Sequence, residues 1–181
     1  RENDVAALLT PADAVEAVEQ SFARLARGSV DNRPRVRLPL EDGALAVMAC
    51  ADHELGYAGH KSYAGASFLL ALYSLEERRL TALVEADVLG RLRTGAASGV
   101  AARHLARDGA ATLGVIGCGR QAATQVACIR AAVPSIERVH AWCRNDERLA
   151  IFCRDHDCQP AESAQHAAEH DVVVTITTSK D

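Results

Sequence analysis

The pattern of apolar and polar positions divides the chain into two parts. In the first part, Val15, Val18 and Phe22 recur at helical spacing. This helix is expected to begin at Pro11, after Thr10 as N-cap, and to end at Gly28. Short apolar runs between turn residues follow and predict strands, of which the first two extended segments are expected to form a hairpin. The later elements are an extended segment over 33–40, strands over 44–50, 56–62, 68–73 and 80–84, and a helix over 88–106.

From Gly109 onward the pattern becomes an alternation of strand and helix. The predicted strands cover 112–116, 139–143 and 171–177, and the predicted helices cover 121–132, 147–154 and 163–169. Such alternation is typical of a parallel α/β sheet. We therefore expect an α/β protein with a boundary near 107–111. The predicted domains are 1–108 and 109–181, and the second holds the first strands of a Rossmann sheet.

Between a predicted strand and the helix after it, the chain reads G-x-G-x-x-A, with Gly117, Gly119 and Ala122 at the small positions. The first glycine permits a tight turn, and the second lets a pyrophosphate approach the backbone. The small third residue lets helix and strand pack closely. The helix N-terminus then offers N–H groups and the positive end of its dipole to an anion. The segment predicts dinucleotide binding; a purely structural turn is the alternative.

The end of the next predicted strand bears on the choice of dinucleotide. In NAD-binding proteins an acid about 20 residues past the glycines holds the ribose hydroxyls. Here Cys143 and Arg144 take that place, and a guanidinium suits a 2′-phosphate. Asn145 adds an amide and Arg120 adds positive potential, so we expect NADP in preference to NAD. The alternative is that Arg144 is solvated and Asp146 caps the next helix.

Composition removes several other classes of protein. The chain has 181 residues, with 20 Lys and Arg against 24 Asp and Glu, a net charge of −4. This balance argues against a broad basic surface for nucleic acid. No run approaches the roughly 18 apolar residues of a membrane span. Six cysteines without a CxxC pair indicate a reducing compartment, the cytoplasm. Cys153, His156 and Cys158 lie close in sequence, but their spacing fits no zinc pattern, so we expect no metal.

Several motifs together resemble those of the ornithine cyclodeaminase/mu-crystallin family. Arg93-Thr94-Gly95-Ala96-Ala97-Ser98 lies ahead of Gly117-Cys118-Gly119-Arg120-Gln121-Ala122, an order typical of that family. Pro34-Arg35, Met48, Gly59-His60-Lys61 and Asp171–Thr178 also match its patterns. The resemblance covers nearly the whole chain and is more specific than any single motif.

The resemblance implies a Rossmann domain paired with an α/β domain for substrate binding and homodimerisation. It implies a nicotinamide-dependent enzyme that acts on the C–N bond of a small amino or imino acid, by cyclodeamination or imine reduction. The positions matching the family's substrate-carboxylate site are Arg35, Lys61 and Arg93, of which Lys61 is also the catalytic candidate, able to polarise a C=N bond. The matching cofactor positions are Thr94, Gly117, Gly119, Arg120, Gln121, Ala122, Arg144, Asn145, Thr175 and Thr177.

Plainer interpretations stay open at the cationic positions. In this alternative, Arg93 is a solvated charge beside Arg91, and Arg35 is one of three surface arginines together with Arg33 and Arg37. A non-catalytic NADP(H)-binding protein is likewise the alternative to an enzyme, because cofactor motifs can outlast activity.

The chain also departs from the family's pattern. Ala46 stands two positions before Met48, where ornithine cyclodeaminases carry a glutamate, which weakens a specific ornithine activity. The family's catalytic aspartate is expected beyond residue 181, so no residue here receives that role. We therefore expect a partial chain whose parallel sheet lacks its last strands.

Overall fold

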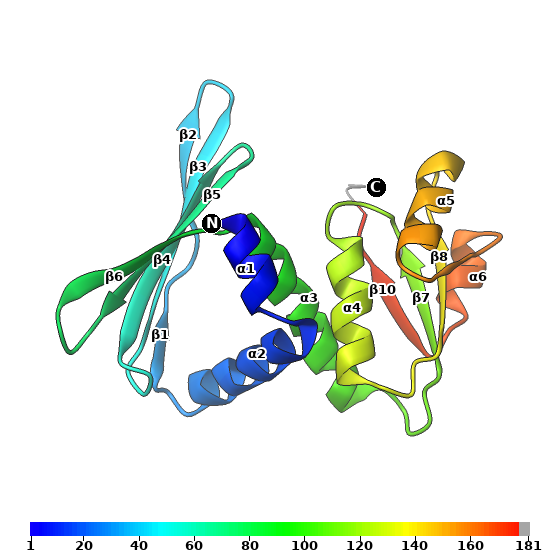
Figure 1. Cartoon of the computed structure of the whole chain (residues 1–181), viewed down its shortest axis with the longest axis horizontal. Coiled ribbons are helices and arrows are strands. Elements are labelled where there is room, and N and C mark those ends of the chain that lie inside the picture. Colours follow the sequence, from blue (N-terminus) through cyan, green and yellow to red (C-terminus); the bar gives the residue numbers. More distant parts are fainter. Residues whose placement is uncertain (178–181) are drawn as a thin grey trace. The chain divides into compact units, whose positions relative to one another are not determined.

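A computed structural model describes residues 1–177 (Figure 1). The chain forms two compact units. The first contains Arg1–Leu9 and Glu19–Gly90, and the second contains Thr10–Val18 and the chain from Arg91 onward. Helices α2 (Pro11–Ala26) and α3 (Asp87–Leu105) each contribute residues to both units. The compact units therefore divide within α3, whereas the domain boundary expected near 107–111 stays a prediction.

The first unit is built on a six-stranded antiparallel sheet. Its order is β1-β3-β4-β5-β6, and β2 also pairs with β3. The strands are β1 (Val30–Asn32), β2 (Val36–Leu40), β3 (Gly43–Asp52), β4 (Tyr57–Ala64), β5 (Ser67–Ser74) and β6 (Arg79–Glu85). The hairpin predicted for 33–40 and 44–50 is confirmed, since β2 and β3 are antiparallel neighbours. The pairs β3–β4, β4–β5 and β5–β6 are antiparallel as well.

A short helix, α1 (Glu2–Leu8), belongs to the same unit and has no counterpart in the sequence-based expectation. It is tied down by the Glu2 carboxylate, which accepts hydrogen bonds from the backbone N–H groups of Asp87 (2.7 Å) and Val88 (2.8 Å). These are N–H groups of the first turn of α3, which lack intrahelical partners. Glu2 therefore stabilises the start of α3.

The second unit carries a four-stranded parallel sheet of order β10-β7-β8-β9. Its strands are β7 (Thr112–Ile116), β8 (Arg138–Trp142), β9 (Gln159–Pro160) and β10 (Val172–Thr175). Its helices are α4 (Ala122–Ala132), α5 (Asp146–Asp155) and α6 (Ala164–Ala168). Figure 1 shows the strand–helix alternation of this unit. The predicted Rossmann-type parallel sheet is confirmed.

The sheet of the second unit is buried at its centre. Leu113 and Val115 of β7 are both 0% exposed, as expected for a strand covered on both faces. A Cβ added to Gly114, which lies between them, would overlap the carbonyl oxygen of Ala167 in α6. Glycine at this position therefore lets α6 approach β7 closely.

Candidate functional site

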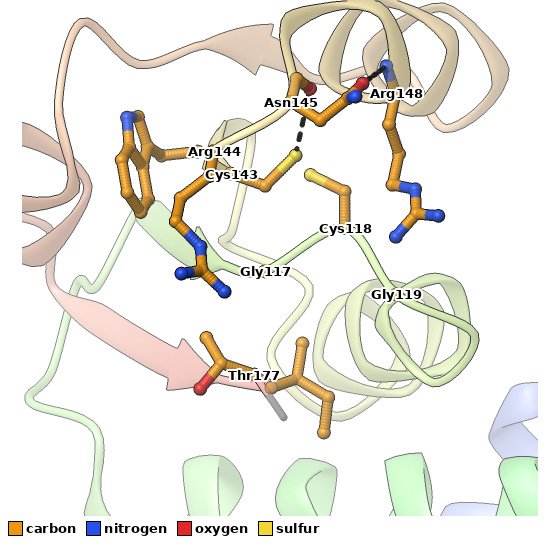
Figure 2. Close-up of a pocket in the computed structure, with 10 residues that line it drawn as sticks. Gly117, Cys118, Gly119, Cys143, Arg144, Asn145, Arg148 and Thr177 are labelled. Atoms are coloured by element: carbon orange, nitrogen blue, oxygen red, sulfur yellow. Dashed lines mark hydrogen bonds between the residues drawn. The ribbon is translucent and has the colours of Figure 1, made fainter. Parts of the chain in front are cut away.

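A cavity of about 420 Å³ lies at the carboxyl ends of the parallel strands. Its walls come from residues 117–119 after β7, residues 142–145 with Arg148 around the β8–α5 turn, and residues 176–177 after β10 (Figure 2). Ligands of open α/β sheets bind outside the carboxyl ends of the strands. The volume lies within the range of small-molecule pockets.

Gly117 forms the turn that leads out of β7. Its φ is +109°, a backbone conformation that side-chain-bearing residues rarely adopt. Its N–H donates to the carbonyl oxygen of Trp142 over 2.8 Å, and an added Cβ would lie 2.7 Å from the carbonyl oxygen of Ile176. Both the backbone angle and the neighbouring strand therefore require glycine here.

Gly119 lines the cavity, but no contact within the unit requires glycine at this position. It is exposed, and an added Cβ would meet only the Ile176 carbonyl oxygen, at 3.9 Å. Its missing side chain therefore serves no packing inside the unit. It leaves the backbone open to a ligand, as the approach of a pyrophosphate requires.

The N-terminus of α4 adjoins this turn. Gln121 occupies the N-cap without a side-chain capping hydrogen bond, and its Oε1 atom is buried without a hydrogen-bond partner. Ala122 is 0% exposed at the first helical position, so it acts as a packing residue. The N–H of Ala122 donates to the Gly119 carbonyl oxygen over 3.0 Å, and the positive end of the α4 dipole favours an anion beside the turn.

The turn after β8 places two cations at the cavity. The Oδ1 atom of Asn145 accepts a hydrogen bond from the backbone N–H of Arg148 over 2.7 Å and so caps α5. The suggested cap at Asp146 is therefore wrong, because Asp146 lies within the first turn of the helix. Arg144 and Arg148 both line the cavity, and within residues 1–177 no Asp or Glu does. The lining is thus electropositive.

Two thiols share this site. Cys118 is buried, and Cys143 is half-buried with its Sγ donating to the Asn145 carbonyl oxygen over 3.3 Å. Figure 2 shows the two side chains pointing toward one another. Burial, together with the neighbouring Cys143 thiol, raises the pKa of Cys118 to about 12. Cys118 is therefore a neutral thiol in this environment.

The structure brings only part of the predicted cofactor set into this cavity. Gly117, Gly119, Arg144, Asn145 and Thr177 line it. The other predicted cofactor residues of this unit lie outside the lining: Thr94 in α3, Arg120 and Gln121 before α4, Ala122 in α4 and Thr175 in β10.

The sequence-based expectation did not assign Cys118, Trp142, Arg148 or Ile176 to the cavity, and it placed Cys143 at the end of the strand without a binding role. Arg148 lies in the first turn of α5. Asn145 as a helix N-cap in the sequence could have predicted this position. The meeting of the two thiols follows from strand pairing, since β7 and β8 are parallel neighbours.

In the first unit, Lys61 of β4 and Arg35, which directly precedes β2, lie on opposite sides of β3. Lys61 of β4 is the register partner of Met48 in β3, and Val36 of β2 is the partner of Val47. Continuing this register by one residue places Arg35 opposite Met48, so Arg35 and Lys61 flank the same β3 position. Neighbouring strands are about 4.8 Å apart, which separates the two backbones by about 10 Å.

The Lys61 ammonium group lies among aromatic rings and close to α3. Its Nζ atom is 5.0 Å from the centroid of the Phe68 ring and 5.8 Å from that of Tyr63. A Cβ added to Gly90 would lie 2.5 Å from Nζ, so glycine at that position leaves room for the ammonium group. Arg93 is an exposed residue of α3 in the second unit. That Arg35, Lys61 and Arg93 bind one carboxylate stays a prediction.

Within residues 1–177, no group of three or more His, Cys, Asp and Glu side chains is arranged to hold a metal ion. His60 stacks on Tyr73 in the sheet, with ring centroids 6.1 Å apart. None of the helices in the described part of the chain combines the length and apolarity needed to cross a membrane.

A parallel sheet with this glycine turn and a cavity at the carboxyl ends of its strands defines a Rossmann-type fold, in which ligands bind at that edge of the sheet. The model of the ornithine cyclodeaminase/mu-crystallin family matches residues 1–181, and the chain belongs to this family. The predicted resemblance is thereby confirmed.

Similar proteins include the alanine dehydrogenase of Archaeoglobus fulgidus, 37% identical over 136 residues, which are 69% of this chain and 42% of that protein. A solved archaeal alanine dehydrogenase dimer with bound NAD has a TM-score of 0.89 at 32% identity, over 99% of this chain and 60% of that one. The solved structure of the iminosuccinate reductase of Paracoccus denitrificans in complex with NAD⁺ has a TM-score of 0.85 at 31% identity. The match covers 99% of this chain and 61% of that one. The chain thus spans about 60% of the length of these solved structures.

Proposed function

We propose that the whole protein is a nicotinamide-dependent oxidoreductase or cyclodeaminase acting on the C–N bond of a small amino or imino acid. The observation that carries this proposal is the cavity at the carboxyl ends of the strands, where Gly117 and Gly119 keep the backbone open beside two arginines. Family membership supports it, as do the relatives named alanine dehydrogenase and iminosuccinate reductase.

The residues present fit a nicotinamide dinucleotide. The 117–122 turn offers open backbone to the pyrophosphate, and Arg144 and Arg148 offer guanidinium groups where the adenosine ribose would lie. When bound, such a cofactor supplies or accepts a hydride at carbon. Because no carboxylate among the described residues lines this cavity, nothing there repels a 2′-phosphate, and we propose NADP(H) as the preferred form. Two solved relatives are described with NAD, so NAD use is the alternative.

The cationic residues would hold the substrate. An amino or imino acid presents a carboxylate, which Arg35 and Arg93 can bind with paired N–H donors. Lys61 would hold the same carboxylate or donate to the substrate nitrogen, which polarises a C=N bond toward hydride addition. Fixing the reacting carbon in this way supplies several kcal/mol of the barrier reduction through orientation alone.

A second copy of the chain is the proposed partner. Val36, Leu38 and Leu40 alternate along β2 and are 58%, 52% and 51% exposed, so one edge of the first unit's sheet presents an apolar face. The archaeal alanine dehydrogenase is described as a dimer. We also place the protein in a reducing compartment such as the cytoplasm, because all six cysteines are free thiols.

An assay with the whole protein tests the proposed activity. Reduced cofactor is mixed with a cyclic imine carboxylate, such as pyrroline-2-carboxylate, or with iminosuccinate, and nicotinamide absorbance is followed. Consumption identifies a reductase, and ammonia release from ornithine or lysine with catalytic oxidised cofactor identifies a cyclodeaminase. Activity that survives in Lys61→Ala would contradict the role of Lys61. A protein that binds dinucleotide but is inert across an amino- and imino-acid panel would favour the non-catalytic alternative.

A further inference from the structure

Two cysteines stand at the point where the cavity meets the sheet. Cys118 is the middle residue of the Gly117–Gly119 turn, and Cys143 directly follows the last residue of β8. Both line the cavity, and their side chains point toward one another (Figure 2). In the proposed function, the backbone of this turn binds the dinucleotide, and neither thiol has a role.

Strand pairing brings the two residues within reach of a covalent link. Ile116 is the register partner of Trp142, and the Gly117 N–H still bonds to the Trp142 carbonyl oxygen at 2.8 Å. Cys143 is the first residue after Trp142, and Cys118 is the second residue after Ile116. Adjacent strands are about 4.8 Å apart. A disulfide needs Cα atoms roughly 4.4–6.8 Å apart, a separation that residues just past two paired strand ends can reach.

The surroundings give the two thiols different parts in such a reaction. Cys143 is half-buried and lines the same cavity as Arg144 and Arg148, so a small molecule in the cavity can reach its thiol. Cys118 is 7% exposed, and burial together with the Cys143 thiol raises its pKa to about 12. Cys143 is thus the thiol that a small oxidant reaches first. Cys118 is the second thiol, which reacts with the oxidised Cys143.

We propose that Cys118 and Cys143 are an oxidative modification site, at which a hydroperoxide drives formation of a reversible disulfide in the wall of the cavity at the carboxyl ends of the strands. The Cys143 thiolate attacks one peroxide oxygen, the O–O bond breaks, and the second oxygen leaves as hydroxide and takes up a proton to give water. Cys143 then carries a sulfenic acid. The Cys118 sulfur attacks that sulfur, and the hydroxide expelled takes the Cys118 proton to form a second water. Two thiols lose two electrons, and the peroxide gains them.

The consequence for ligand binding rests on the proposed function. The link ties the turn that would receive the pyrophosphate to the strand end that carries Arg144, so the turn loses its freedom to adjust to a ligand. We expect the oxidised protein to bind dinucleotide about tenfold more weakly, within the range of ordinary site-to-site coupling. Since such coupling is reciprocal, bound dinucleotide must disfavour the disulfide by the same factor.

Peptide mapping of the whole protein under non-reducing conditions tests the site directly. A Lys or Arg lies between every neighbouring pair of cysteines, so trypsin puts each of the six on its own peptide. After brief exposure to hydrogen peroxide, we expect peptides 108–120 and 139–144 to be joined and to separate with dithiothreitol. Added NADPH should reduce the yield of this link. Cys50→Ser, which changes an exposed thiol of the first unit, should leave the link intact, whereas Cys118→Ser and Cys143→Ser should abolish it.

The possible outcomes separate this inference from the proposed function. A link from either peptide to Cys153 or Cys158, or irreversible oxidation of Cys143 without a link, overturns the inference. So does a disulfide that leaves dinucleotide affinity unchanged. If the reduced protein binds no dinucleotide but the link still forms, the proposed function fails and the modification site stands. The mapping uses the unaltered sequence, so it stays decisive even where a serine variant folds poorly.

Discussion

The side chain of Asn145 holds the backbone of Arg148, with 2.7 Å between Oδ1 and the amide nitrogen. This bond caps α5 and fixes the turn from which Arg144 and Arg148 reach the cavity. A residue expected to contact the cofactor therefore also shapes the site that would receive it.

Two substitutions of Asn145 should separate the effect of the cap on stability from the effect of a charge at this position on cofactor binding. Asn145→Ala leaves a first-turn N–H without its partner, so we expect the free energy of unfolding to fall by about 1 kcal/mol. Asn145→Asp keeps the cap but puts a carboxylate at the cavity. It should retain stability, as measured by denaturant unfolding, and lose affinity for NADPH more than for NADH. A variant Asn145→Asp with unchanged preference would contradict the proposed position of the 2′-phosphate.

The two glycines of the turn should respond differently to alanine. In Gly117→Ala, the φ of +109° and a Cβ only 2.7 Å from the Ile176 carbonyl oxygen both oppose folding, so we expect a loss of at least about 2 kcal/mol. In Gly119→Ala, the nearest atom is 3.9 Å away, so stability should stay near that of the parent. Dinucleotide affinity should nevertheless drop, since the new methyl group occupies the approach to the backbone. Thermal unfolding and a binding titration on both variants check the contrast.

Helices α3 and α4 should tolerate no side chain where their backbones meet in the second unit. A Cβ added to Gly95 would overlap the carbonyl oxygen of Thr124, and one added to Gly99 would lie 2.7 Å from that of Cys128. Gly95→Ala should therefore lower the melting temperature despite the higher helix propensity of alanine. The matched control is Ala101→Ser on an exposed position of α3, which should change stability by less than about 0.5 kcal/mol. Equal melting temperatures for the two variants would show that the close approach is unimportant.

The sequence predicted those parts of the fold that depend on local chemistry. Thr10 and Pro11 mark the start of α2, and the Thr10 hydroxyl accepts from the Asp13 N–H over 3.1 Å, as an N-cap should. The strand predicted over 112–116 coincides with β7. The glycine turn was equally readable, because φ above zero and close backbone contact restrict Gly117 to one residue type.

What the sequence could not predict depends on contacts between distant segments. Helix α1 has too few residues for a periodic pattern and is held by Glu2 against the start of α3. Strand β9, only Gln159–Pro160, is defined by its pairing with β8. At the site, the meeting of Cys118 with Cys143 follows from the parallel register of β7 and β8, for which the spacing of cysteines along the chain gives no signal.

Acid should weaken the second unit through Asp171. Its carboxylate accepts hydrogen bonds from the N–H groups of Ala111 (2.8 Å) and Thr112 (3.0 Å), and from Arg107. The bonds to Ala111 and Arg107 are the main causes that hold the pKa of Asp171 well below its usual value. The folded state therefore favours the charged carboxylate, and its stabilisation is present above about pH 4 and lost as the pH falls further.

We accordingly expect Asp171→Asn to be less stable than the parent at pH 7 and to differ from it progressively less below about pH 4. Urea unfolding at a series of pH values measures this difference. Asp108→Asn, at an exposed position nearby, serves as the control and should follow the parent throughout. A stability gap that stays constant down to pH 2 would rule out the charged carboxylate as its source.

Dinucleotide binding at the cationic cavity is the central claim, and Trp142 allows a direct measurement of it. This residue is the single tryptophan of the chain and lines the cavity, so its fluorescence should be quenched as NADPH or NADH is titrated in. We expect NADPH to bind more tightly, and Arg144→Ala to weaken NADPH by about tenfold to a hundredfold while leaving NADH nearly unchanged. Arg154→Ala, an exposed arginine of α5 outside the cavity, should alter neither titration. Equal or tighter binding of NADH with Arg144→Ala silent would contradict the proposed NADP(H) preference, and no response to either dinucleotide would contradict the site itself.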